Sequence, residues 1–283
     1  MNTLKLKQML QQFFIEDIGE CDVTSDTIFN QDEQGTLTFI AKEDGVFSGS
    51  AVINTGFALL DHQILVELFV QDGEVFETGQ QLARMTGNMA SLLKGERVVL
   101  NLVQRMSAIA TQAHKATMIL AGTKTRACDT RKTTPGLRML EKYAVRSGGA
   151  FNHRYGLYDA VMIKDNHISF AGSITKAVQT VKAKLGHTTK VEVETESADQ
   201  VQEAVEAGAD IIMFDNRSPE EIKQLIKLVP EHIITEASGG INLTNLALYR
   251  ETGVDYISLG SLTHSVRALD ISAKVAEREG VIK

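Results

Sequence analysis

Residues 124–138 read KTRACDTRKTTPGLR, and this stretch decides the fold because it places a cationic loop between a strand and a helix. Residues 124–129 favour β-structure, and residues 137–145 have the spacing of an amphipathic helix. The loop between them holds Arg131, Lys132, hydroxyl side chains and a Pro-Gly turn, which suit a site for anionic oxygens. Strand-to-helix loops are where α/β folds bind ligands. The competing interpretation is a solvated charged loop.

Beyond this stretch, strands and helices alternate to the end of the chain. The expected strands cover residues 125–128, 160–163, 190–194, 211–214, 233–237 and 256–259, and the expected helices cover about 136–147, 173–184, 197–207, 219–228, 243–251 and 269–277. Successive βα units imply parallel strands with right-handed crossovers. The strands are too few for a complete eight-stranded barrel, so a closed but irregular barrel competes with an open doubly wound sheet. Ser197 and Ser218 are N-cap candidates, the latter with Pro219 at the first helical position.

The first third of the chain has a different pattern. A helix is expected over residues 3–17, strands over 36–42, 45–49, 64–70 and 80–86, a helix over 50–60 and a long helix from about 92 to 120. Runs of strands with few helices are typical of an α+β domain. We therefore expect an N-terminal α+β open-sandwich domain over residues 1–108, joined by a C-terminal helix at about 266–283, and an α/β domain over residues 109–265.

Composition limits the classes of function. The chain has 283 residues, of which 43% are hydrophobic and 23% charged, as is usual for a globular protein. Its net charge of −7 and the lack of a basic block give no support for a nucleic-acid or membrane-surface role, and no apolar run reaches membrane-spanning length. Cys21 and Cys128 lack the spacing of metal ligands, so we expect a reducing, cytoplasmic location.

Polar residues collect at the ends of the predicted strands. In chain order they are Asp129-Thr130-Arg131-Lys132, Asn152-His153-Arg154 before the second strand, Lys164-Asp165-Asn166-His167, Glu192-Val193-Glu194, Asp215-Asn216-Arg217, Glu236-Ala237-Ser238-Gly239-Gly240 and Ser258-Leu259-Gly260-Ser261. In a parallel barrel these ends converge on one mouth, so we expect the groups to share a site. Each has an ordinary explanation when taken alone, because a carboxylate can cap a helix and Lys164 can extend its amine to solvent.

These groups sort by chemistry into three sets. The cationic and imidazole donors suit a ligand with several carboxylates or phosphates; they are Arg131, Lys132, His153, Arg154 and Lys164. Glu194 and Asp215 are separated carboxylates suited to holding Mg²⁺ beside a phosphate. The small-residue turns Ser238-Gly239-Gly240 and Gly260-Ser261 let backbone N–H groups approach a phosphate monoester. The nucleophile elbow Gly-x-Ser-x-Gly does not occur in the sequence.

Several of these strings, in the same order and spacing, resemble the quinolinate phosphoribosyltransferase family along essentially the whole chain. The strings are residues 130–136, Asn152-His153-Arg154, residues 163–167, Glu192-Val193-Glu194, Phe214-Asp215-Asn216, residues 237–240, Asp22-Val23-Thr24-Ser25 and Gly95-Glu96-Arg97. Departures from the family pattern are small: Cys21 and Ala150 stand where glycine is common, Met89-Ala90 replaces Ala-Arg, and Ser107-Ala108 replaces Ser-Gly. Loss of that arginine would weaken a peripheral contact.

The resemblance implies an incomplete, about seven-stranded α/β barrel and a homodimer with shared active sites, in which Arg97 enters the neighbour's site. It also implies Mg²⁺ and the substrates quinolinate and phosphoribosyl diphosphate, with nicotinate mononucleotide, pyrophosphate and CO₂ as products. By this resemblance, quinolinate would be bound by Arg97, Arg131, His153, Arg154 and Lys164, and Lys132 would lie near the diphosphate. The ribose hydroxyls and Mg²⁺ would be held, directly or through water, by Glu194 and Asp215. The 5-phosphate would be held by Ser238, Gly239, Gly240, Ser258, Gly260 and Ser261. Lys132, Lys164, Glu194 and Asp215 would be the catalytic residues.

Two other functions are compatible with parts of the pattern. A Schiff-base aldolase would use a strand-end lysine such as Lys164, although the abundance of arginine and the two strand-end acids argue against it. A transferase-like paralogue associated with molybdate transport would bind a small anion without turnover. The intact strings at residues 131–136 and 152–154 disfavour this second alternative.

Overall fold

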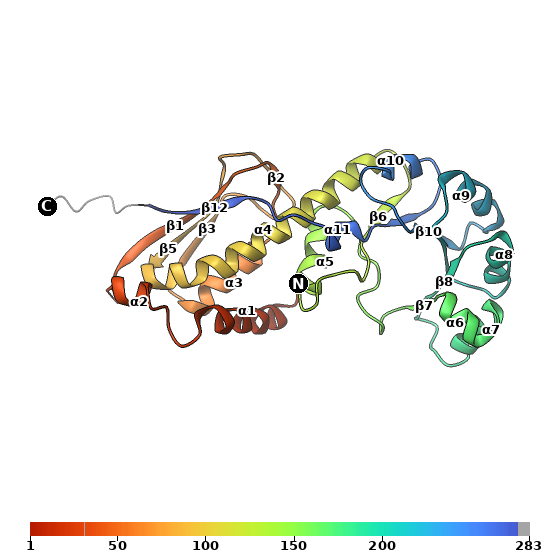
Figure 1. Cartoon of the computed structure of the whole chain (residues 1–283), viewed down its shortest axis with the longest axis horizontal. Helices are drawn as coiled ribbons and strands as arrows, with labels where there is room; N and C mark the ends of the chain where they lie inside the picture. The colour runs from red at the N-terminus through yellow and green to blue at the C-terminus, as the bar shows by residue number, and fades with distance from the viewer. Residues whose placement is uncertain (31, 277–283) are drawn as a thin grey trace. The chain divides into compact units, whose positions relative to one another are not determined.

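The computed structural model of the chain describes residues 1–30 and 32–276, which form two compact units. The N-terminal unit comprises Met1–Thr111, Met139–Gly148 and the described residues from Val266 onward. The barrel unit comprises Gln112–Arg138 and Gly149–Ser265. Figure 1 labels the elements of both units.

An antiparallel sheet organises the N-terminal unit. Its strand order is β12-β1-β5-β3, formed by β12 (Ile271–Ala276), β1 (Gln34–Ala41), β5 (Gln81–Asn88) and β3 (Leu65–Leu68). A separate two-stranded ribbon pairs β2 (Gly45–Val46) with β4 (Val75–Phe76), so the strand predicted over 45–49 is shorter than expected. The α+β character predicted for this part of the chain is therefore confirmed.

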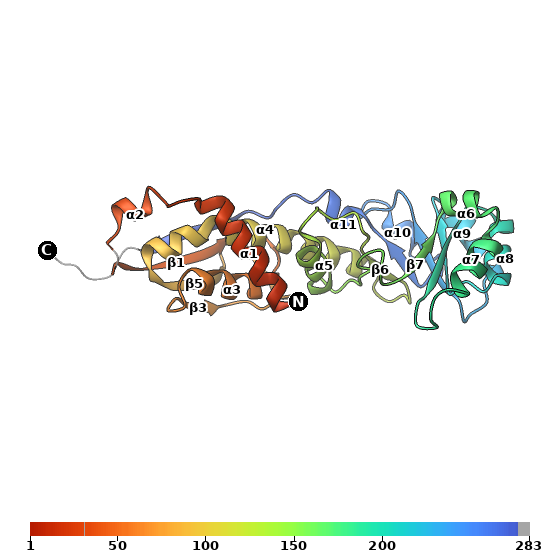
Figure 2. The same ribbon diagram turned by 90° about the horizontal axis from the view of Figure 1, so that it is seen from below.

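Helices cover this sheet through apolar side chains. Helix α3 (Ser50–Leu60) packs Phe57 against Phe39 of β1, with ring centroids 6.4 Å apart, and α1 (Thr3–Ile18) packs on α3 (Figure 2). The long helix α4 (Met89–Leu120) passes so close to α3 that a Cβ at Gly95 would lie 2.8 Å from the Phe57 ring. Glycine is required there because larger side chains would force the two helices apart. A short helix, α2 (Ser25–Ile28), lies between α1 and β1.

The barrel unit contains a parallel sheet of six strands with the order β6-β11-β10-β9-β8-β7. The strands are β6 (Arg126–Cys128), β7 (Val161–Ile163), β8 (Val191–Thr195), β9 (Ile211–Asp215), β10 (Ile234–Ser238) and β11 (Tyr256–Ser258). Each strand from β7 onward pairs with the next strand in the sequence, and the last strand, β11, pairs with the first, β6. This order is that of a barrel, and it excludes the doubly wound alternative, in which strand order reverses at a switch point.

The barrel is incomplete at one place. Phe151 forms an isolated parallel bridge with Cys128, on the side of β6 away from β11, so it occupies the position of a seventh strand. No β-pairing joins Phe151 to β7 among the described residues. The expected incomplete barrel of about seven strands is confirmed, with the seventh strand reduced to a single bridge.

Helices lie outside these strands, as Figure 1 shows for α7 and α8. The helices after the strands are α5 (Arg138–Ser147), α6 (Asp165–Ala171), α7 (Ile174–Lys182), α8 (Ala198–Glu206), α9 (Pro219–Leu225) with the 3₁₀ turn Ile226–Leu228, α10 (Leu246–Tyr249) and α11 (Ser261–His264). The predicted N-caps are confirmed: Ser197 accepts from the Gln200 N–H, and Ser218 forms a capping box with Glu221. Helix α6 was not predicted.

Two predicted helices were wrong in extent or type. The helix expected over 243–251 shrinks to one turn, because the Asn242 and Asn245 side chains bind nearby backbone N–H groups and hold a turn. The segment 269–277 was predicted as a helix, but its described part is the strand β12. Its apolar residues alternate, and the free edge of β1 offers it a ladder that runs from Ile271↔Ala41 to Ala276↔Thr36.

None of the helices in the described part of the chain is both long enough and apolar enough to cross a membrane.

The strand assignment of the C-terminal segment makes a prediction about stability. Ile271 is buried where β12 meets β1, whereas Val275 in the same strand is half exposed. We expect Ile271→Ala to lower the free energy of unfolding by about 2–5 kcal/mol, because it leaves a cavity in a packed core. Val275→Ala should cost less than about 1 kcal/mol. Denaturant unfolding followed by circular dichroism measures both values, and equal costs would contradict this burial pattern.

Candidate active site

The carboxyl ends of the barrel strands surround a cavity of about 500 Å³. Because side chains alternate along a strand, residues two apart on one strand point to the same side and form two levels. Met162 and Met213 lie at the lower level, and Lys164 and Asp215 lie two residues farther along the same strands. The cavity is lined by Thr130, Arg131, Lys132, His153, Arg154, Met162, Lys164, Glu194, Met213, Asp215, Asn216, Ser238, Gly239, Gly240 and Ser258.

The loop after β6 contributes the cationic wall. Arg138, at the start of α5, holds this loop by donating to Thr133 Oγ1 (2.9 Å) and to the Arg131 carbonyl (3.5 Å). Thr263 in α11 donates its hydroxyl hydrogen to the Lys132 carbonyl at 2.8 Å. The Nε of Arg131 is buried and has no hydrogen-bond partner, which leaves a donor available for an anion.

Arg154 completes this wall. Its Nη1 donates to the Ala160 carbonyl at 3.0 Å, which fixes the guanidinium. Burial lowers the pKa of Arg154, and the charge of Arg131 lowers it further. Two guanidinium groups that repel each other in a half-buried site are stabilised by an anion placed between them, so this wall favours a ligand with more than one negative charge.

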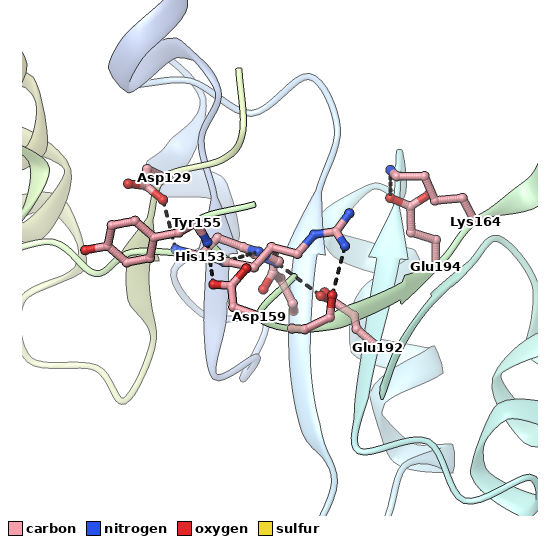
Figure 3. Close-up of polar contacts among 10 residues, drawn as sticks. Asp129, His153, Tyr155, Asp159, Lys164, Glu192 and Glu194 are labelled. Atoms are coloured by element: carbon pink, nitrogen blue, oxygen red, sulfur yellow. Dashed lines mark hydrogen bonds and ion pairs between the residues drawn. The ribbon is translucent and has the colours of Figure 1, made fainter. Parts of the chain in front are cut away.

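Two carboxylates, those of Glu194 and Asp215, also line the cavity. Glu194 ends β8 and accepts a hydrogen bond from the Lys164 ammonium (Figure 3). Burial is the main cause that raises the pKa of Glu194; the charges of Asp215 and Glu192 raise it further, and Lys164 opposes them. Glu194 and Asp215 are thus close enough to repel each other. A divalent cation would relieve that repulsion, and carboxylate oxygens are ligands that Mg²⁺ prefers. The residues fit this metal.

The turn that carries His153 is fixed by Asp129, a fully buried residue directly after β6. Its carboxylate accepts from Asn152 Nδ2 at 2.6 Å and from the His153 backbone N–H at 2.8 Å. Both ring nitrogens of His153 are engaged by the protein: Nδ1 accepts the Arg154 backbone N–H at 2.7 Å, and Nε2 lies 3.1 Å from Glu192 Oε2 (Figure 3). His153 therefore presents its ring to the cavity without an unengaged nitrogen.

A turn of small residues forms another part of the wall. Gly239 and Gly240 have φ of +91° and +65°, and Asn216, which faces them after β9, has φ of +53°. A Cβ at Gly239 would lie 2.2 Å from Asn216 Oδ1 and 2.7 Å from the Asn216 backbone nitrogen. No side chain fits at Gly239, so the backbone here can approach a ligand closely. Such turns bind phosphate groups through N–H donors.

Most residues predicted for the site line this cavity, and three do not. Those that line it are Arg131, Lys132, His153, Arg154, Lys164, Glu194, Asp215, Ser238, Gly239, Gly240 and Ser258. Gly260 and Ser261 lie behind Lys132, because a Cβ at Gly260 would be 2.9 Å from Lys132 Cδ. Arg97 belongs to α4 in the N-terminal unit, is largely exposed, and pairs with Glu96 at 3.3 Å.

Glu192 and Glu236 were expected at the strand ends that share the site, but the sequence assigned neither of them a role. Both are buried beneath the cavity, where their carboxylate oxygens and His153 Nε2 all lie within 4.8 Å of one another. Strand alternation could have found them, since each lies two residues before a predicted site residue, Glu194 or Ser238. Glu192 and Glu194 lie two residues apart in one strand, so their side chains point to the same side of the sheet.

Comparisons with known proteins agree with one another along the chain. Residues 22–107 match the family described as "Quinolinate phosphoribosyl transferase, N-terminal domain", and residues 109–274 match "Quinolinate phosphoribosyl transferase, C-terminal domain". The chain is 52% identical over 275 residues to a probable nicotinate-nucleotide pyrophosphorylase [carboxylating] of Bacillus subtilis (97% of this chain, 95% of that protein). A Synechocystis protein of the same description is 44% identical over 269 residues (94% and 91%). The crystal structure of NadC from Streptococcus pyogenes matches with a TM-score of 0.95, 39% identity and 99% of both chains.

The crowding at Gly239 makes a prediction about the site. We expect Gly239→Ala to weaken the binding of a phosphomonoester, probed with ribose 5-phosphate, by about tenfold or more, because the Asn216 turn must move. Gly186→Ala is the matched control, since no atom lies within 4 Å of its Cβ position. Isothermal titration calorimetry measures both affinities. Unchanged binding in Gly239→Ala would show that this turn does not hold the phosphate.

Proposed function

The chain belongs to the quinolinate phosphoribosyltransferase family, and we propose that the cavity at its barrel strand ends is where that family's reaction takes place. The enzyme transfers the phosphoribosyl group of phosphoribosyl diphosphate to quinolinate with loss of a carboxyl group. The products are nicotinate mononucleotide, pyrophosphate and CO₂, and the reaction serves NAD biosynthesis. One observation carries the placement: cationic side chains, an acidic pair and a small-residue turn line a single cavity.

Arg131, Arg154 and Lys164 are the proposed donors to the quinolinate carboxylates. The mutual repulsion of the two guanidinium groups and the unpartnered Nε of Arg131 both favour a dicarboxylate. His153 was expected to donate directly to a carboxylate. In its present geometry it would do so only by giving up its contact with Glu192, so we propose that it mainly positions its neighbours. Lys132, which follows Arg131 on the same loop, is proposed to face the diphosphate.

The chemistry needs a nucleophile held in line with the ribose and no general base. The pyridine nitrogen attacks ribose C1 as pyrophosphate leaves, and positive charge develops on the sugar. Glu194 and Asp215 are the carboxylates that would stabilise this charge and hold the ribose hydroxyls. N-ribosylation makes the ring cationic, so the ring stabilises the electron pair left on C2 when the C2–carboxylate bond breaks and CO₂ leaves. C2 then takes a proton from water, which gives the C2–H bond of the product. The arginines orient the dicarboxylate, which lowers the entropic barrier.

Mg²⁺ is proposed as the cofactor, held by Glu194 and Asp215 directly or through water. The support is the repulsion between these two carboxylates, which raises the pKa of Glu194. When bound, the ion would neutralise the charge of the diphosphate leaving group. Lys164 already neutralises part of Glu194, so Asp215 is the less compensated ligand.

We also propose a homodimer in which Arg97 serves the partner's cavity. Exposed large apolar residues on the barrel unit support a covered surface: Leu157 is 74%, Tyr158 85% and Phe170 95% exposed. Arg97 itself is solvent-accessible and makes a single weak surface ion pair, so it can enter another site at little cost. Cys21 and Cys128 are not joined in a disulfide, which is compatible with the proposed reducing, cytoplasmic location.

The two alternative functions are less well supported. A Schiff-base lysine must lose its proton, whereas the bond from Lys164 to Glu194 favours the charged ammonium. The relatives named above are pyrophosphorylases, and neither alternative explains that agreement.

The reaction is tested by its stoichiometry. Purified protein with Mg²⁺, quinolinate and phosphoribosyl diphosphate is expected to release CO₂ and pyrophosphate one to one, as measured by ¹⁴C-carboxyl release and a coupled pyrophosphate assay. Removal of divalent ions with EDTA should abolish both, and Mg²⁺ should restore both. If neither product forms, the assigned reaction is wrong. If turnover persists in EDTA, only the metal proposal fails.

The shared site is tested by mixing inactive variants. Arg97→Ala and Lys164→Ala homodimers are each expected to lose most activity. Purified mixed dimers should recover up to about half of wild-type activity, because one of their two sites contains neither substitution. Two affinity tags allow the mixed dimers to be purified and assayed. If the mixed dimers stay inactive, Arg97 does not serve the partner's site. As a control, Lys5→Ala takes the place of Arg97→Ala in the same mixtures, because Lys5 is an exposed cation outside the site.

A further inference from the structure

A small cluster of buried acids lies beneath the cavity and has no role in the steps above. Glu192 of β8 and Glu236 of β10 are 1% and 4% exposed. Figure 3 shows Glu192 facing His153, whose Nε2 lies 3.1 Å from Glu192 Oε2 and 3.6 Å from Glu236 Oε1. Two carboxylates this close and this deep repel each other strongly unless hydrogens or cations are supplied.

The hydrogen bonds around these two carboxyls lack one donor hydrogen. The Arg154 backbone N–H can only donate, so His153 Nδ1 accepts, and the ring hydrogen of a neutral His153 is at Nε2. That hydrogen reaches Glu192 Oε2, while Glu236 Oε1 at 3.6 Å is beyond a good hydrogen bond. Glu192 Oε1 and Glu236 Oε1 are both buried without a hydrogen-bond partner. Ser258 Oγ is also buried without a hydrogen-bond partner, and its hydroxyl hydrogen is the other donor beside Glu236. A hydroxyl donates one hydrogen, which serves only one of the two carboxylate oxygens. An acid hydrogen on one of the two carboxyls would supply the donor that is still missing.

The charged and polar groups around each carboxyl decide which of the two carries the acid hydrogen. Glu192 receives the His153 Nε2–H and interacts with the positive charge of Arg154, so it is the better compensated of the two carboxyls. Glu236 faces the negative charges of Glu192 and Glu194 on β8, with His153 and the Ser258 hydroxyl of β11 opposing them. Its neighbour on β9 is the uncharged Met213. Glu236 is the carboxyl with the weaker compensation.

We propose that Glu236 works as a neutral carboxylic acid beside the better compensated Glu192, and that this keeps the cavity floor receptive to a dianionic substrate. Burial, followed by the charge of Glu192, raises the pKa of Glu236 to about 8, in agreement with this assignment. Glu236 acts on the substrate through the charge of the floor, so it is a positioning residue. The effect on binding rests on the proposed placement of quinolinate, whereas the protonation itself does not.

The protonation of Glu236 makes quinolinate binding depend on pH. Below a pH of about 8, Glu236 holds its proton and the buried pair carries one negative charge. As the pH rises through that value, a second charge appears beneath the cavity and repels the quinolinate carboxylates. We expect the KM for quinolinate to increase at least tenfold, because one unit charge at roughly 10 Å with an effective dielectric constant of about 20 already costs about that factor for each substrate carboxylate. The kcat should change much less, because bound substrate and transition state feel similar repulsion.

Infrared spectroscopy of the substrate-free enzyme tests the protonation. Wild-type protein at pH 6.5 is expected to show the carbonyl stretch of a protonated carboxylic acid in the difference spectrum against Glu236→Gln, and this band should vanish as the pH rises through about 8. Glu231→Gln, which replaces an exposed glutamate before β10, is the matched control and should show no such band. An absent band in the spectrum of folded Glu236→Gln against wild type overturns the proposal, whatever the enzyme's activity.

Steady-state kinetics between pH 7 and 9 test the consequence. The KM for quinolinate should rise in wild type and stay flat in Glu236→Gln, which has the shape and charge of the neutral acid. Ser258→Ala should move the wild-type rise to higher pH, because the Ser258 hydroxyl lowers the pKa of Glu236. If Glu236→Gln does not fold, the pH dependence of KM in wild type and in Ser258→Ala still tests the effect on binding. A wild-type KM that does not change with pH overturns the effect on binding. Lack of turnover at every pH would instead contradict the proposed function.

Discussion

The pairing of β6 with β11 is the contact on which the site depends. It joins the first strand of the barrel to the last, in the register Tyr256↔Arg126 to Ser258↔Cys128. That closure brings the cationic loop after β6 beside the turn that follows β11, where Thr263 binds the Lys132 carbonyl. Without it, residues more than a hundred positions apart would lie on opposite edges of an open sheet. Parallel strands make the pairing productive, because all their carboxyl ends face one mouth.

Strand alternation then arranges the charges in two levels. The upper level carries groups suited to contact substrates, such as Lys164 and Glu194, and the lower level carries methionines together with the buried acids Glu192 and Glu236. The acids below partly balance the arginines above, so neither set is an isolated buried charge. Asp129 links the levels, since it fixes the turn from which His153 reaches down to Glu192. The binding surface is thus supported by a second layer of hydrogen-bonded ionisable groups.

On the proposed placement of the substrates, this arrangement lets one cavity serve two unlike ligands. A flat dicarboxylate needs planar donors, and the guanidinium groups of Arg131 and Arg154 provide them. A sugar phosphate needs close backbone approach at one end and oxygen ligands near its reacting carbon, which the turn at Gly239 and the carboxylate of Asp215 provide. The charges of the site are not neutralised internally, and the unpartnered Nε of Arg131 is one sign of this. Substrate binding completes the compensation.

The sequence by itself determined the alternation of strands and helices in a parallel α/β unit, the two-part organisation of secondary structure and most of the cavity lining. These features depend on local periodicity and on the rule that parallel strand ends converge. Tertiary structure decided three things that local pattern does not contain: barrel closure, the strand state of 271–276, and the depth of Glu236. Closure and edge pairing join segments distant in the chain, so no window of sequence reports them. The state of a carboxyl depends on its burial and on neighbours from other strands, which exist only after folding.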